Sequence, residues 1–367
     1  MNIYDYIDDY GVYTFKEKKF NDVDAAIFSF IIYANLKYVI KNNQMKISEA
    51  GKKISLLYKN KDNNIVAVKQ GNELLSYIKD VNRYKDCLLT QFDIDEKHDV
   101  QYSAISIEYT KNKVFVAFEG TNELFSGWKE NLLLSYKFPT KSQVLAVSYL
   151  NRNYTFSKKK IILGGHSKGG NLALTAGMYA NYLVRNKIEF IYSMDGPGLL
   201  DHQFKSKRYK NILKKYKHII PDYSVVGLFL NNSNNYVVKS KIKNIYSHSI
   251  ITWDIGNNYN FINTKLSTYS KDLQLEIRKW IAKYNTEDKK EFIDNLSYLL
   301  KQAGVVSILD LKENKDKLYA LIKEYKAVTP HTKKVLEDFI KIIIKCYETA
   351  FYKDIKGKVN KMFNFKL

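Results

Sequence analysis

Residues 161–173, IILGGHSKGGNLA, place Ser167 at the centre of the pattern G-x-S-x-G. A short apolar run precedes the pattern, and apolar residues at helical spacing follow it. A strand, a sharp turn and a helix are the setting in which this pattern forms a nucleophile elbow. Its glycines remove side chains that would collide at the turn. We therefore expect the Ser167 hydroxyl to lie exposed above a sheet edge, with the backbone N–H of Lys168 facing the reacting carbonyl.

The composition indicates a soluble globular protein of one large domain or two smaller ones. The chain has 367 residues, of which 45% are hydrophobic. Cys87 and Cys346 are far apart, so no disulfide framework or cysteine metal site is expected, and a reducing compartment fits. The N-terminus lacks the pattern of a signal peptide, and the longest apolar run, 25–36, is too short to span a bilayer. These features predict a cytoplasmic location.

The formal net charge of +21 raises the question of an anionic partner. The excess is almost entirely lysine, whereas proteins that read nucleic acids usually depend on arginine for bidentate contacts. No nucleic-acid-binding motif accompanies the charge. We expect no specific nucleic-acid partner, and at most weak association with an anionic membrane surface.

Alternating strands and helices predict an α/β fold with a mostly parallel central sheet. Helices are expected over 22–40, 48–57, 72–78, 142–151, 171–184 and 205–216. Strands are expected as a hairpin over 101–109 and 113–119, and singly over 161–163, 188–194, 218–220 and 237–245. From residue 271 onward the pattern is purely helical.

The predicted organisation is a domain over 1–265 followed by an α-helical C-terminal region over 266–367. Within the first part, 1–95 is a mostly helical lead-in and 96–265 is the catalytic core. The C-terminal region could serve as a cap, an interaction module or an extension of the domain.

Further motifs follow one another in the order of a known family. They are TFKEKKFNDVD at 14–24, QYSAI at 101–105, VAFEGTN at 116–122, GWKEN at 127–131, DGPG at 195–198 and SVVG at 224–227. Together with the elbow and His248 they make the chain resemble the Mbeg-like group of bacterial proteins, near the class 3 lipases among the α/β-hydrolases. The resemblance covers about residues 1–255 and implies an α/β-hydrolase-like fold with flanking helices.

Four positions depart from the family pattern. Glu119 and Asn122 stand where the family usually has arginine and aspartate, Asn131 replaces another aspartate, and Lys19 replaces a proline. The first three remove or invert a charge near the expected site. They favour an alternative in which catalysis is impaired, but they do not alter the nucleophile.

A serine hydroxyl needs a base within hydrogen-bond reach and a carboxylate that orients the base. In this fold the chain order is serine, acid, histidine. His248 follows the last predicted strand and is the expected base, whereas the His166 side chain should point away from Ser167 into the packing around the elbow. Asp195 and Asp222 both follow predicted strands and both remain candidates for the acid. The resemblance favours Asp195, because Asp-Gly-Pro-Gly is the more regular family feature.

The oxyanion formed during ester cleavage needs backbone donors. One is the N–H of Lys168, and the resemblance to class 3 lipases indicates Thr121 as the other. The Lys168 side chain would either add positive potential at the mouth of the site or be solvated. Trp128, Tyr102 and Phe125 could line an acyl pocket or pack in the core.

These features predict a serine hydrolase that cleaves a carboxylic ester, lipase- or esterase-like, through an acyl-enzyme. The expected substrate is a small-molecule or lipid ester, and the reaction needs neither a metal nor an organic cofactor. The alternative is a catalytically impaired α/β-hydrolase scaffold that acts as an interaction module, through its helical tail or its basic surface.

Overall fold

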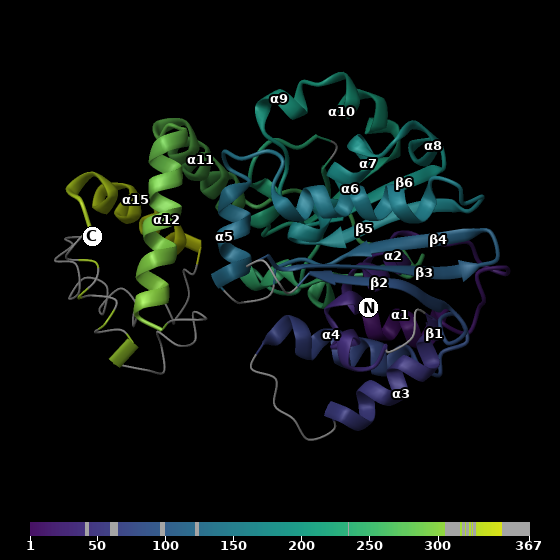
Figure 1. Cartoon of the computed structure of the whole chain (residues 1–367). Helices are drawn as coiled ribbons and strands as arrows, with labels where there is room; N and C mark the ends of the chain where they lie inside the picture. The colour runs from purple at the N-terminus through teal and green to yellow at the C-terminus, as the bar shows by residue number, and fades with distance from the viewer. Residues whose placement is uncertain are drawn as a thin grey trace.

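An eight-stranded sheet with helices on both faces forms the centre of the molecule (Figure 1). The computed structural model describes residues 1–40, 44–58, 65–95, 100–121, 125–233, 235–304, 316, 317, 320, 323, 325 and 328–346. The strands lie side by side in chain order: β1 Gln44–Lys46, β2 Leu88–Asp95, β3 Tyr102–Thr110, β4 Lys113–Phe118, β5 Lys160–His166, β6 Ile188–Met194, β7 Tyr216–Pro221 and β8 Asn235–Val238.

The sheet is antiparallel at one edge and parallel over the rest. Strands β1 to β4 pair antiparallel, whereas β4 to β8 pair parallel, with crossover connections between the parallel strands. The predicted hairpin is confirmed as β3 and β4. The arrangement is an α/β-hydrolase-like fold, as predicted.

Helices account for most of the remaining described residues. Their bounds are α1 Ile3–Tyr10, α2 Asp22–Phe30, α3 Ile47–Tyr58, α4 Val66–Ile78, α5 Phe125–Leu133, α6 Lys141–Tyr154, α7 Lys168–Tyr179, α8 Tyr182–Arg185, α9 Asp201–Phe204, α10 Lys207–Ile212, α11 Thr268–Lys283, α12 Thr286–Gln302 and α15 Pro330–Cys346.

Strand β4 shows why the central strands read as continuous apolar runs. Phe115 and Ala117 face a core shared with α2, whereas Val114, Val116 and Phe118 face a second core shared with α6 and α7. Because successive side chains point to opposite faces, a strand covered on both sides must be apolar at every position. The two cores cover both faces of the sheet beneath the carboxyl ends of β4, β5 and β6.

Several boundaries differ from the sequence predictions. The helix expected over 171–184 is two helices, α7 and α8, and the one expected over 205–216 ends at Ile212, before β7 begins. The helix expected over 22–40 ends at Phe30 and continues as short 3₁₀ turns, because Ala34 is extended, with a ψ of 151°. The strand expected over 237–245 ends at Val238. The lead-in 1–95 contains β1 and β2 beside its helices. In β2 a bulge at Gln91, which has a φ of 55°, interrupts the alternation that would have marked the strand.

Helices α11, α12 and α15 group beside α5 in Figure 1. Their shared core contains Trp280, Phe292 and Val335, and α12 packs on α5. The division of the chain into 1–265 and 266–367 stays a prediction. Among the described residues, no helix combines the length and the apolar character that crossing a membrane requires.

Candidate active site

Ser167 occupies a strained turn between β5 and α7. Its backbone angles, a φ of 57° and a ψ of −133°, lie in a region that residues other than glycine rarely adopt. A Cβ on Gly165 would lie 2.3 Å from the carbonyl carbon of Gly169, and a Cβ on Gly169 would lie 2.1 Å from the Phe118 oxygen. Both glycines of the motif are therefore required by close backbone approach. The turn has the geometry of a nucleophile elbow.

Ser167, His248 and Thr121 line one cavity of about 300 Å³. Ser167 is 4% exposed, so it lies more deeply than the exposed position expected from the sequence, and its hydroxyl has no hydrogen-bond partner among the described residues. The hydroxyl therefore faces the cavity without being engaged elsewhere. Most of the other lining residues are apolar.

His248 and Asp195 form a direct pair. The distance from His248 Nδ1 to Asp195 Oδ2 is 2.6 Å, and the Asp195 side chain is fully buried at the end of β6. The other oxygen of Asp195 accepts hydrogen bonds from the Ser224 hydroxyl at 2.5 Å and the Gly227 N–H at 3.0 Å. With a carboxylate accepting at Nδ1, the lone pair of the neutral ring lies on Nε2. That is the tautomer a general base needs.

Asp222 has a different environment. Its carboxylate accepts the N–H of Ser240 at 3.1 Å, and its own N–H donates to Val238. Burial raises the pKa of this carboxyl. Within the described structure it makes no hydrogen bond to His248, so of the two candidate carboxylates Asp195 is the one that His248 contacts.

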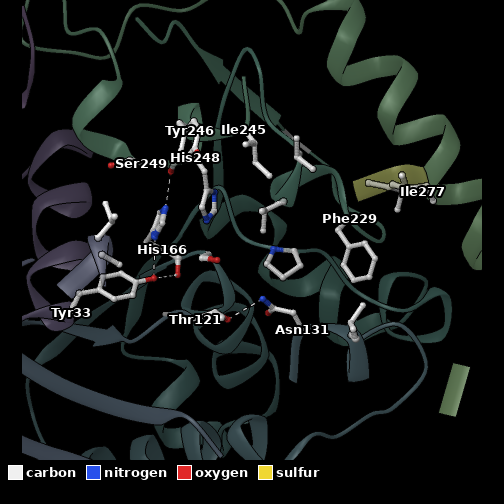
Figure 2. Close-up of a pocket in the computed structure, with 18 of the residues that line it drawn as sticks. Tyr33, Thr121, Asn131, His166, Phe229, Ile245, Tyr246, His248, Ser249 and Ile277 are labelled. Atoms are coloured by element: carbon white, nitrogen blue, oxygen red, sulfur yellow. Dashed lines mark hydrogen bonds between the residues drawn. The ribbon is translucent and has the colours of Figure 1, made fainter. Parts of the chain in front are cut away.

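Two backbone N–H groups, those of Lys168 and Thr121, lie near the elbow and the end of β4. The N–H groups of Lys168 and Thr121 donate to no acceptor among the described residues. A Cβ on Gly120 would lie 1.9 Å from the Tyr33 hydroxyl and 3.1 Å from the Ser167 Cβ, so glycine lets this loop approach the nucleophile. The Thr121 hydroxyl accepts from the Asn131 amide at 2.9 Å (Figure 2).

The expectation of a positive Lys168 side chain at the mouth, or in solvent, is wrong. This side chain is 1% exposed and pairs with the Glu130 carboxylate at 2.7 Å. It also donates to the Gln101 carbonyl. A buried charge needs such partners, and this one ties the start of α7 to α5.

Of the three aromatic residues proposed for an acyl pocket, only Tyr102 has a described side chain, and it does not line the cavity. Tyr102 packs in the core beside α6, which agrees with the alternative expectation for it. The side chains of Trp128 and Phe125 lie outside the described residues. The Glu119 side chain is half-buried and its carboxylate accepts the Ser103 hydroxyl at 2.5 Å, and desolvation raises the pKa of this carboxyl. Asn122 also lies outside the described residues.

His166 has a role that the sequence did not indicate. Its ring lines the same cavity as Ser167, and Nε2 bonds the His248 carbonyl at 2.8 Å while Nδ1 bonds the Tyr33 hydroxyl at 3.0 Å (Figure 2). The expectation that the ring points away from Ser167 stays a prediction. Since a carbonyl only accepts, Nε2 carries the proton and Nδ1 accepts. Burial holds the pKa of His166 well below its usual range. The neutral ring holds the backbone of His248 through this bond, and the centroids of the two imidazoles lie 4.3 Å apart with the rings tilted by 39°.

The other histidines lie away from the nucleophile or outside the described residues. His218 is buried in β7, where it bonds Asn235 at 2.7 Å and the Gly196 carbonyl at 3.0 Å. His202 and His331 are exposed. His98 lies outside the described residues. The part of the chain that the structure describes contains no cluster of three or more metal-ligating side chains.

The buried histidines predict loss of stability in mild acid. Burial lowers the pKa of His218 and His166 in the folded protein, so below about pH 6.5 the unfolded chain binds protons first. Stability therefore falls as the pH drops, by up to about 1.4 kcal/mol per pH unit for each ring. Urea unfolding at pH 6.5 and 5.5 should show a smaller fall in His218→Gln. The exposed His202→Gln is the matched control, and equal slopes in all three proteins would contradict the prediction.

The model of the Mbeg1-like family matches residues 78–298. The Rhizomucor miehei lipase propeptide complex is similar at 14% identity over 41% of this chain and 57% of that chain, with a TM-score of 0.30. The crystal structure of M37 lipase is similar at 14% identity over 57% of this chain and 70% of that chain, with a TM-score of 0.35. No curated protein matches the chain.

Proposed function

This chain belongs to the Mbeg1-like family, and we propose that it is a serine hydrolase that cleaves carboxylic esters through an acyl-enzyme. One observation carries the proposal. A strained elbow serine and a histidine bonded to a buried aspartate line the same largely apolar cavity. This combination supplies a nucleophile, a base and an orienting acid.

In the proposed reaction Ser167 Oγ attacks the ester carbonyl carbon while His248 Nε2 takes its proton. Asp195 stabilises the imidazolium, and the N–H groups of Lys168 and Thr121 donate to the oxyanion. As the tetrahedral intermediate collapses, His248 gives the proton to the departing alcohol. Water then attacks the acyl-enzyme by the same steps. A Ser167–His248 hydrogen bond is not required in the free enzyme, because such bonds often tighten only when substrate binds.

The alternative of an impaired scaffold has less support. It was suggested by Glu119, Asn122 and Asn131. Glu119 does not line the cavity. Asn131 does line it, and its side-chain amide donates a hydrogen bond to the Thr121 hydroxyl. A cytoplasmic location and weak association with anionic membrane stay predictions from the sequence.

Labelling with a fluorophosphonate probe tests the proposal. The folded wild-type protein should be labelled on the peptide that contains Ser167, and Ser167→Ala should not be labelled. Ser249→Ala is the matched control, because Ser249 lines the same cavity but bonds Gln70 and lies outside the triad. A folded wild-type protein that resists the probe would favour the scaffold.

A further inference from the structure

The cavity at Ser167 is closed on one side by the C-terminal helices. Ile277 and Trp280 of α11 and Phe339 and Ile342 of α15 line it. On each helix the two residues are three positions apart and so share one face. The Trp280 and Phe339 rings lie 5.3 Å apart, and the two helices pack on each other. Segments more than a hundred residues from the nucleophile therefore form part of its cavity.

The histidine of the proposed triad and the apolar residues next to the C-terminal helices lie on different sides of the cavity. Phe229 and Ile277 lie on one side of it, whereas Tyr33, His166 and His248 lie on the other (Figure 2). Val225, Phe229 and Ile245 are only partly buried by the core of the C-terminal helices, and they also line the cavity. An apolar ligand that covered these side chains would remove more of their apolar surface from water, which lowers the free energy.

The proposed chemistry orients a substrate in this space. His248 must protonate the departing oxygen, so the alcohol lies on the side of His248. The acyl chain then extends away from it, toward Phe229 and Ile277. A volume of about 300 Å³ is at the lower end for small-molecule sites, which suits one chain of moderate length rather than a long one.

We propose that α11 and α15 form the acyl-binding wall of this site, that the substrates are esters of a single medium-length apolar acid, and that Ile277 and Phe339 limit the chain length. This inference rests on the proposed function. It gives the C-terminal helical region a part in substrate selection.

Ile277→Phe should narrow the pocket without touching the triad. The kcat/KM values for p-nitrophenyl acetate, octanoate and palmitate are measured with the full chain. We expect wild-type protein to prefer octanoate, and Ile277→Phe to lower kcat/KM for octanoate about tenfold or more while acetate changes little. Leu275→Phe is the matched control, because Leu275 is on the same helix, 52% exposed and outside the cavity lining.

Phe339→Ala should enlarge the pocket instead of narrowing it, and it keeps the proposal testable if Ile277→Phe does not fold. It should raise the ratio of palmitate to octanoate turnover by lengthening the pocket. Unchanged chain-length ratios in both variants, with Ser167 still labelled by fluorophosphonate, would overturn the acyl wall and leave the hydrolase intact. A wild-type protein without labelling or ester turnover would remove the proposed function, and the acyl wall with it.

Discussion

Asp195→Asn is expected to lower kcat for a short ester by about four orders of magnitude. The amide can donate to His248 Nδ1, which favours the tautomer with its proton on Nε2. That ring cannot accept the Ser167 proton. The amide oxygen can still accept from Ser224 and Gly227, so the turn after β6 should keep its structure. Steady-state kinetics give the change, and unaltered circular dichroism would show that the fold is kept.

Asp222→Asn is the matched control for this experiment. Its carboxylate accepts the Ser240 N–H, a bond that the amide oxygen of asparagine can also accept. We expect kcat to stay within about threefold of wild type, since a neutral replacement leaves the His248–Asp195 pair in place. A slow Asp222→Asn variant beside an active Asp195→Asn variant would reverse the assignment of the acid. Full activity in both variants would contradict the proposed triad.

The core of the fold could be predicted because its signals are local. Residues 161–173 encode a strand, a turn and a helix within one short stretch, and strand β6 was predicted with its observed bounds, Ile188–Met194. Apolar runs bounded by turn residues suffice where both faces of a strand are buried. Strand β2 escaped prediction because its bulge and its polar residues hide the period of two.

For the site, the sequence predicted the order of the candidate residues along the chain but not the contacts between them. The chain order of a triad was enough to select Ser167 and His248 as candidates, but the contact between His166 and the His248 carbonyl joins residues 82 positions apart. The pairing of Lys168 with Glu130 depends on where α5 crosses the start of α7. The lining by Ile277 and Phe339 depends on how the C-terminal helices pack. The periodic pattern of apolar residues, which predicts helices and strands, carries no information about such contacts.

The N-terminal motif at 14–24 was recognised only by resemblance, and the structure gives it a physical role. Asp24 is fully buried, with its carboxylate 2.6 Å from Arg83 Nη2 and 2.8 Å from the Tyr84 hydroxyl. The Arg83 guanidinium also donates to the carbonyls of Lys18 and Lys19. The motif therefore folds around a buried ion pair that joins α2 to the segment before β2.

Arg83→Met is expected to lower the free energy of unfolding by about 3–5 kcal/mol, because it leaves the Asp24 carboxylate buried without its counter-charge. Urea unfolding measures the loss. Arg152→Met is the matched control, since Arg152 pairs with Asp93 at 2.7 Å while 58% of its side chain is exposed, and such pairs contribute below about 1 kcal/mol. The double variant Arg83→Met/Asp24→Leu should recover part of the loss by removing the stranded charge. A loss for Arg83→Met no larger than that for Arg152→Met would show that the buried pair does not hold this motif in place.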